Sequence, residues 1–276
     1  MDLSHNQLLE LQQLAIDAAT KAGKYIISHK PKSIEHKDAG SSMASQVVTE
    51  VDRESQRLLV EALAPCITKY DLGLLAEEEA DDGSRLVKDY FWCIDPLDGT
   101  LPFIEGRSGY AVAIALISKA GVAVLGVVYN PKEDMCYSAI TGGGVMLNGE
   151  TFAPKQKDKE TFTIFHHRSL LKHPDCKVIL QNYQHSFEEK GYQNFEYIYH
   201  GGAIMNAIWS IENKPSFYFA LPKKAQGGGC IWDYAATACI FTELGYKVTD
   251  YHGNALMLNN PETIFMNASG VIYANY

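Results

Sequence analysis

The first apolar residues of the chain recur every three or four positions, which is the spacing of one face of a helix. This pattern predicts one long amphipathic helix over residues 5–29, closed by Pro31. A second helix is predicted within residues 47–64, with Thr49 as a plausible N-cap. The apolar positions that define the two helices are Leu8, Leu9, Leu11, Leu14, Ala15, Ala18, Ala22 and Ile26, then Leu58, Leu59, Ala62 and Leu63.

Short continuous apolar runs follow, and they are typical of buried strands. The runs "LGLLAEEEADDG" (72–83) and "YFWCIDP" (90–96) each end in carboxylates. Between residues 110 and 147, β-rich runs separated by "KAG", "NPKED" and "TGGG" predict an antiparallel meander. The first part of the chain therefore combines two helices with one extended sheet.

Helical and extended patterns alternate from residue 161 onward. Strands are predicted at 161–165, 177–180, 216–221, 246–250, 263–267 and 271–275, and helices at 203–211 and 232–244. We interpret the chain as two α/β halves, residues 1–154 and 155–276. The fold class predicted from these elements is mixed α/β (α+β).

Composition excludes several classes of protein. The chain has 276 residues, of which 46% are hydrophobic, and a formal net charge of −9, which argues against binding a nucleic-acid polymer through bulk positive potential. No apolar run reaches the roughly 20 residues of a membrane-spanning helix, and the acidic N-terminal stretch is unlike a signal peptide. The six cysteines show no C-x-x-C spacing. We expect a cytoplasmic protein with reduced thiols and no stable membrane insertion.

The candidate chemistry lies in clustered carboxylates. Asp95 and Asp98 in "DPLDGT" (95–100) could form a simple turn, because Asp-Gly is a common turn former. Against that alternative, "EEE" (77–79) also follows an apolar strand, and Asp233 begins an apolar helix. Clustered carboxylates repel one another unless a bound cation compensates their negative charge. Mg²⁺ prefers oxygen ligands of this kind. A pair of metal ions could activate water and neutralise the leaving oxygen of a phosphate ester.

The backbone after Asp98 adds a second component. Gly99 and Thr100 could begin a helical turn whose free N–H groups point at an anion. An aspartyl nucleophile that becomes phosphorylated is the alternative phosphatase chemistry, but it requires D-x-D-G-T spacing. Here the spacing is D-x-x-D-G-T, so phosphoryl hydrolysis by metal-activated water is favoured.

Four segments in order resemble the inositol monophosphatase superfamily of magnesium-dependent, lithium-sensitive phosphomonoesterases, which includes the CysQ-type 3′(2′),5′-bisphosphate nucleotidases. They are "VVTEVD" (47–52), "LLAEEE" (74–79), "DPLDGT" (95–100) and "IWDYAATACIFTELG" (231–245). The segments "VLGVVYNP" and "GGGVMLNGE" add to the likeness, which covers most of the chain. The resemblance implies a layered αβαβα sandwich of the sugar-phosphatase type with the site between its halves.

The resemblance also implies a set of two to three Mg²⁺ ions and their ligands. Glu77, Asp95 and the carbonyl of Leu97 would hold the first ion, and Asp95, Asp98 and Asp233 the second. Glu77 takes the ligand role when Ala76 is aligned with the small residue of the family motif. In that alignment Glu78 is supporting and Glu79 faces solvent.

The same resemblance implies the catalytic roles. Thr100, supported by Asp52, would orient the metal-bound water that attacks phosphorus, and Asp52 would help a third, weaker metal site with Glu77. The amides of Gly99 and Thr100 would receive the phosphate. Without the resemblance, Asp52 would be interpreted as a surface charge on a helix.

The substrate expected from the resemblance is a small phosphate ester, most closely adenosine 3′,5′-bisphosphate, with inositol 1-phosphate and fructose 1,6-bisphosphate as alternatives. The Phe-Ile pair in "GTLPFIEG" (99–106) favours the nucleotidase, whereas Leu101-Pro102 departs from it, and Gln226 stands where inositol enzymes have a glutamate. Arg168, Lys223 and Lys224 are candidate partners of a second phosphate. A homodimer is compatible with the resemblance, and a sensor without catalytic activity on the same fold is the alternative of another class.

Overall fold

The computed structural model describes residues 2–29, 35–36, 47–156, 160–225 and 229–276. Pro31 and Gln226, which figured in the predictions, lie outside them. The helices are α1 (His5–Ser28), α2 (Glu50–Tyr70), α3 (Ser84–Val87), α4 (Thr100–Ile104), α5 (Cys176–Glu188), α6 (Ala203–Glu212) and α7 (Ile231–Glu243), with a 3₁₀ helix at Arg168–Lys172. The strands are β1 (Glu35–His36), β2 (Val47–Val48), β3 (Gly73–Ala76), β4 (Tyr90–Asp98), β5 (Ala111–Ser118), β6 (Ala123–Asn130), β7 (Met135–Ile140), β8 (Gly144–Leu147), β9 (Glu150–Thr151), β10 (Thr161–His166), β11 (Asn194–Ile198), β12 (Ser216–Ala220), β13 (Lys247–Thr249) and β14 (Val271–Ala274).

Two sheets organise the described residues, apart from the short β1–β2 pair. The seven-stranded sheet has the sequential order β3 to β9, and it is antiparallel except for the parallel pair β3 and β4. The five-stranded sheet has the order β11-β10-β12-β14-β13, with β10 parallel to both its neighbours. Because β5 to β8 follow one another as antiparallel neighbours, the β-rich runs and the turn residues between them sufficed to predict this meander.

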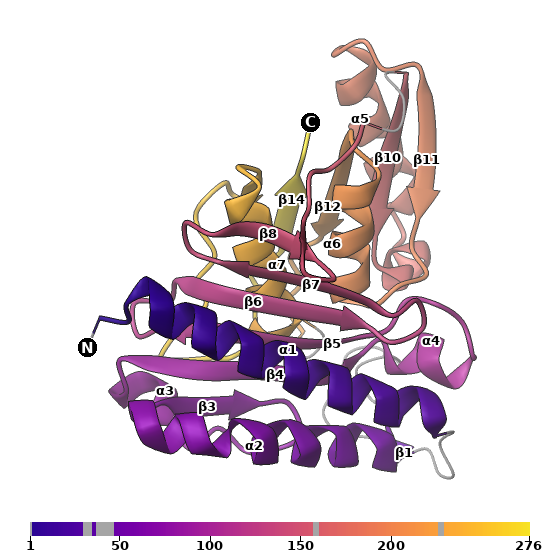
Figure 1. The fold of residues 1–276 in the computed structure, drawn as a ribbon. Coiled ribbons are helices and arrows are strands. Elements are labelled where there is room, and N and C mark those ends of the chain that lie inside the picture. Colours follow the sequence, from indigo (N-terminus) through magenta and orange to yellow (C-terminus); the bar gives the residue numbers. More distant parts are fainter. Residues whose placement is uncertain (1, 30–34, 37–46, 157–159, 226–228) are drawn as a thin grey trace.

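The layers alternate helix and sheet, as the resemblance implied (Figure 1). Helices α1 and α2 cover one face of the seven-stranded sheet through a cluster that includes Leu11, Leu59 and Trp92. Helices α6 and α7 lie between the two sheets, and α5 covers the outer face of the five-stranded sheet. The predicted mixed α/β class and the αβαβα order are confirmed.

The contact of α7 with the larger sheet is especially close. A methyl group on Gly126 of β6 would overlap the carbonyl oxygen of Ala236 in α7, so only glycine permits this approach. Helix α7 belongs to the second half of the chain but packs on strands of the first half. The predicted division after residue 154 falls between β9 and β10 and stays a proposal.

Two predicted strands are wrong. Residues 177–180 belong to α5, whose side chains Ile179, Leu180 and Tyr183 pack on the five-stranded sheet at helical spacing. Residues 263–267 form no strand and contribute only an isolated bridge between Phe265 and Cys230. The edge strand β11 was not predicted. The predicted helices at 5–29 and after Thr49, and those around Asn206 and Asp233, are confirmed.

Candidate active site

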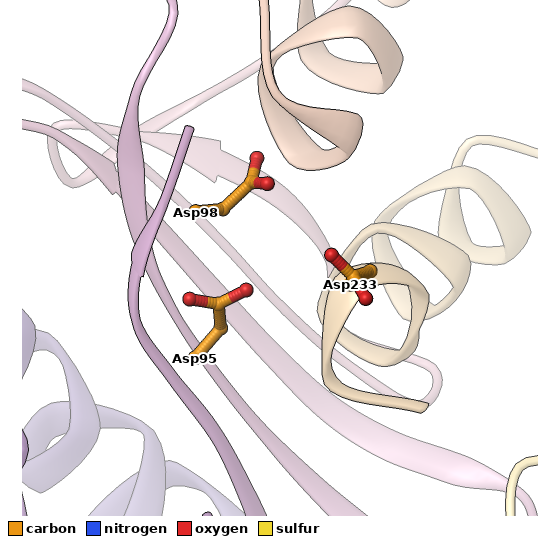
Figure 2. Close-up of side chains that lie close together, drawn as sticks. All are labelled: Asp95, Asp98 and Asp233. Atoms are coloured by element: carbon orange, nitrogen blue, oxygen red, sulfur yellow. The ribbon is translucent and has the colours of Figure 1, made fainter. Parts of the chain in front are cut away.

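The carboxyl end of β4 forms a bulge that turns two aspartates to one side. Asp95 pairs with Ala113 and Asp98 with Ala111, so β4 carries one extra residue between them. Residues three apart on a regular strand point to opposite faces, whereas a bulge can bring both to the same face. Both carboxylates lie on the side of β4 that faces Asp233, and that of Asp98 points toward the start of α6 (Figure 2). The predicted turn is therefore also the device that clusters the carboxylates.

Gly99 ends this strand and begins the next element. Its φ of +80° lies in the left-handed region, and a side chain there would overlap the carbonyl oxygen of Gly109. Gly99 is the N-cap of α4, which starts at Thr100, as the sequence predicted. Two separate constraints, the positive φ and the close approach of Gly109, therefore require glycine at this position.

Three carboxylates meet at the site. One oxygen each of Asp95, Asp98 and Asp233 lies within 4.8 Å of the others. Asp95 and Asp98 are buried, at 1% and 7% exposure, and Asp233 is partly exposed. Glu77 adds a fourth carboxylate, because the register of parallel β3 and β4 pairs Ala76 with Ile94 and so brings Glu77 beside Asp95.

The electrostatics of this cluster fit a divalent cation. Burial raises the pKa of Asp95 well above its ordinary value, and the charges of Glu77, Asp98 and Asp233 raise it further. Burial also raises the pKa of Asp98 to about 7. Such a set of buried carboxylates is ionised at neutral pH when a cation compensates the repulsion. Oxygen donors alone, from separate elements, are the donor set that suits Mg²⁺.

Asp98 has a second set of contacts, at the N-terminus of α6. Its Oδ1 accepts from the amide of Ala203 at 3.2 Å, and its Oδ2 accepts from the amide of Ile204 at 2.8 Å. The positive end of the helix dipole also favours this carboxylate. A methyl group on Gly202 would overlap the carboxylate, so the approach depends on that glycine. Gly202 was not identified from the sequence, although it belongs to a "GG" pair directly before a predicted helix.

Asp233 is held by its own helix. It is the third residue of α7, and its Oδ2 accepts from the amide of Cys230, the N-cap residue, at 2.5 Å. This bond fixes the carboxylate at the start of the helix, facing the β4 bulge (Figure 2). The prediction that Asp233 lies with Asp95 and Asp98 agrees with this geometry.

Asp52 joins α2 to α4. Its Oδ2 accepts from the amide and the hydroxyl of Thr49, at 2.9 and 2.6 Å, which completes the capping box of α2. Its Oδ1 accepts from the hydroxyl of Thr100 at 3.0 Å. Burial raises the pKa of Asp52, and the bonds from Thr49 act in the opposite direction. Asp52 is only 2% exposed, so the interpretation as a surface charge is wrong.

The three-glutamate segment turns immediately after β3. Glu77 and Glu78 are partly buried, and Glu79 is exposed. The amide of Glu78 donates to Oε1 of Gln56 on α2 at 2.8 Å. Gln56 and its neighbour Ser55 were not identified from the sequence, because nothing in a helix pattern shows which loop a buried polar side chain will contact.

The three candidate partners of a second phosphate differ in placement. Arg168 is half exposed and pairs with Glu105 at 3.0 Å, just beyond the end of α4. Burial lowers the pKa of Lys223, and the charge of nearby Asp233 acts in the opposite direction. Lys224 is exposed. Lys223 is therefore near enough to Asp233 for the two charges to interact.

A partly buried histidine, His167, lies close enough to Lys223 to feel its charge. His167 Nε2 bonds the hydroxyl of Tyr218 at 2.8 Å. Burial lowers the pKa of His167 to about 4, and the charge of Lys223 lowers it as well. His167 is therefore a neutral group at physiological pH. The charge of Lys223 thus acts on His167, and the charge of Asp233 acts on Lys223.

Comparison with known proteins gives a consistent result. The model of the "Inositol monophosphatase family" matches residues 7–276. "Inositol monophosphatase 2" of Solanum lycopersicum is 37% identical over 146 residues, which cover 51% of this chain and 52% of the tomato protein. The chain thus spans about half the length of the first curated relatives that it matches.

Two solved structures share the fold over nearly the whole chain. CysQ from Bacteroides thetaiotaomicron, described as a bacterial member of the inositol monophosphatase family, has 26% identity and a TM-score of 0.74, covering 97% of this chain and 98% of CysQ. An IMPase/NADP phosphatase complexed with Mg²⁺ and phosphate has 20% identity and a TM-score of 0.73, covering 97% and 91%. Within the described part of the chain, no helix has the length and apolar character required to cross a membrane.

Proposed function

Because the chain belongs to the inositol monophosphatase family, we propose that it is a Mg²⁺-dependent phosphomonoesterase acting on a small phosphorylated metabolite. The observation that carries this proposal is the buried meeting point of Asp95, Asp98 and Asp233. Two residues beyond Asp98, the Thr100–Asp52 pair supplies a polarised hydroxyl. Metal-assisted hydrolysis needs carboxylates that bind the metal ion and a polar group, here a hydroxyl, that orients the attacking water.

The proposed metal ligands are the carboxylates of Glu77, Asp95, Asp98 and Asp233 and the carbonyl of Leu97. Bound Mg²⁺ would supply Lewis-acid activation of water and neutralise charge on the phosphate. Two to three ions are proposed, with Asp52 and Glu77 contributing to the weakest site. The likeness to a phosphatase solved with Mg²⁺ and phosphate supports the choice of metal.

The chain's own groups would orient the attack on phosphorus. The proton of Thr100 Oγ1 points to Asp52, so its oxygen lone pairs can accept a hydrogen bond from the attacking water. That arrangement turns a lone pair of the water toward phosphorus. The water oxygen then forms a bond to phosphorus as the ester oxygen leaves. The amides of Gly99 and Thr100 are proposed to bind the phosphate oxygens.

The proposed substrate is a 3′(2′),5′-bisphosphate nucleotide, hydrolysed to the monophosphate. Likeness to CysQ over 97% of the chain supports this choice, and Lys223, half-buried beside Asp233, offers a cation for the second phosphate. Arg168, paired with Glu105, and Lys224 are secondary candidates. Inositol 1-phosphate is the competing substrate, and fructose 1,6-bisphosphate is the third.

A protein of another class, a metal or phosphate sensor on the same fold, is the contrasting hypothesis. A sensor needs the carboxylates but has no use for a hydroxyl polarised by a buried carboxylate. The retained Thr100–Asp52 bond therefore favours an enzyme.

Side-by-side kcat/KM values for the three substrates, with purified protein and Mg²⁺, test the proposal. We expect adenosine 3′,5′-bisphosphate to give the highest value and LiCl to inhibit the reaction. Binding of phosphate esters without any release of inorganic phosphate would favour the sensor.

A cytoplasmic location and a homodimer complete the proposal. The location rests on the six scattered cysteines, which show no C-x-x-C spacing. The family resemblance is compatible with the dimer. Cell fractionation and light scattering of the purified protein measure these two properties independently of activity.

A further inference from the structure

One face of α2 contacts three separate segments of the candidate site. Asp52, Ser55 and Gln56 stand at positions i, i+3 and i+4, which share a helix face. They are 2%, 0% and 3% exposed. Asp52 accepts a hydrogen bond from Thr100 at the start of α4. Ser55 donates one to the carbonyl of Pro96 in the β4 bulge. Gln56 accepts one from the amide of Glu78 after β3. A single helical turn is thus bonded to every segment of the first half that carries a proposed ligand.

We propose that Ser55 and Gln56 are positioning residues of the metal site, which they shape without touching metal or substrate. This inference rests on the proposed function, since it concerns the same carboxylates. Gln56 sets the place of the Glu77–Glu79 turn, and Ser55 sets the conformation of the bulge between Asp95 and Asp98.

Gln56 holds a strongly charged segment. Three consecutive glutamates repel one another, and the turn that carries them follows a strand of only four residues. The bond from the Glu78 amide to Gln56 Oε1 ties the middle of this turn to α2. Because Glu77 precedes that amide directly, the bond also fixes where the Glu77 carboxylate lies relative to Asp95.

Ser55 contacts the β4 bulge, which carries one extra residue. In an unbroken ladder the carbonyls of a strand bond its neighbours, but a bulge leaves a group unpaired. The Pro96 carbonyl lies in the irregular stretch between Asp95 and Asp98, and it accepts from the hydroxyl of Ser55 at 2.8 Å. A buried carbonyl without a partner would be costly, so this bond stabilises the bulge that clusters the carboxylates.

Mn²⁺ binding to the purified protein, followed by electron paramagnetic resonance, tests the inference directly. The variants are Ser55→Ala, which removes only a hydroxyl, and Gln56→Met, which keeps the length but removes the acceptor. We expect each to raise the Mn²⁺ dissociation constant by about 10-fold, the effect of losing a group that orients metal ligands. Glu61→Gln, an exposed change on α2 that perturbs only the pair with Arg57, is the matched control and should bind as the wild type does.

Thermal unfolding of the metal-free variants separates positioning from plain structural support. A lower midpoint with unchanged Mn²⁺ affinity in both variants would overturn the inference and leave the proposed function intact. Wild-type protein that binds Mn²⁺ but hydrolyses no ester would overturn the proposed function, while the affinity ratios of the variants would still decide the role of Ser55 and Gln56. Wild-type protein that binds no Mn²⁺ would overturn both.

Discussion

The hydroxyl of Thr100 donates to Oδ1 of Asp52 at 3.0 Å across 48 positions of the sequence. The other oxygen of the same carboxylate is occupied by Thr49 in the capping box of α2. Asp52 therefore binds both threonines at once, Thr49 through one carboxylate oxygen and Thr100 through the other. Through Thr100, the Asp52 carboxylate would help to orient the attacking water, whereas Asp95 and Asp98 in the β4 bulge would bind metal.

Substitution of Thr100 by alanine should separate catalysis from metal binding. Thr100→Ala removes the hydroxyl that would orient water, so kcat should fall by roughly 10²-fold while Mg²⁺ affinity changes little. Asp95→Asn, by contrast, should abolish activity and weaken Mg²⁺ binding, because Asp95 belongs to the carboxylate cluster. Steady-state kinetics and calorimetric titration with Mg²⁺ measure the two effects, and equal loss of affinity in both variants would contradict this division of roles.

Gly202→Ala should displace Asp98 from the N-terminus of α6. The added methyl group would overlap the carboxylate, and overpacking of this kind costs about 1–3 kcal/mol of stability. Activity should fall as well, because Asp98 would leave its place opposite Asp233. Gly245→Ala is the control: its φ of +73° is strained, but the position is open. It should lower the unfolding midpoint without changing kcat, and a parallel loss of kcat there would argue against a local effect at Gly202.

Two adjacent lysines provide a matched pair for testing the second phosphate. Lys223→Met should raise KM for adenosine 3′,5′-bisphosphate by roughly 10-fold, the value of one charge-assisted hydrogen bond, and affect inositol 1-phosphate less. Lys224→Met changes an exposed side chain and should leave both KM values unaltered. The same loss for both esters in Lys223→Met would place the lysine at the phosphate that is hydrolysed.

The stability of the metal-free protein should depend on pH through the buried aspartates. The pKa of Asp98 is raised from 3.8 to about 7, and that of Asp95 is raised in the same direction. The folded state thus favours the protonated carboxyls, whose stabilising contribution is complete below pH 4 and is lost as the pH rises through 7. The unfolding midpoint in EDTA should fall by several degrees between pH 5 and pH 8.

Two further measurements check the cause of that pH dependence. Mg²⁺ should reverse the decline at pH 8, because it binds the ionised carboxylates. Asp98→Asn should flatten the decline in EDTA. An unchanged slope in this variant would assign the titration to other groups.

Sequence patterns predicted most of the fold because most elements are defined locally. Where the prediction was wrong or missing, the secondary structure depends on contacts with residues distant in the sequence. Residues 177–180 form a short apolar run, which fits a strand or one turn of a helix equally well. They are helical because the apolar side chains of α5 pack against the five-stranded sheet. Residues 263–267 have strand composition but only one bridging partner, Phe265 with Cys230. Edge strand β11 is only five residues long, and among the described residues it pairs with β10 alone.

The residues of the candidate site likewise fall into two groups, those that a local sequence motif predicts and those that depend on tertiary contacts. The carboxylates of Asp95 and Asp98 stand in one short segment, so the sequence alone suggested their proximity. Gly202, Ser55 and Gln56 become informative only after folding brings them against those segments. Groups that would contact metal are thus visible in short motifs, whereas the groups that position them depend on tertiary contacts.

Asp52 and Asp233 share a structural position that bears on how the protein acquires its metal. Each is the third residue of a helix and accepts from the amide of its own N-cap residue, Thr49 or Cys230. Both carboxylates therefore already stabilise a helix start before any ion arrives. We therefore expect the protein to fold without Mg²⁺ and to bind it afterwards, so that removal of the ion by a chelator is reversed by adding the ion back.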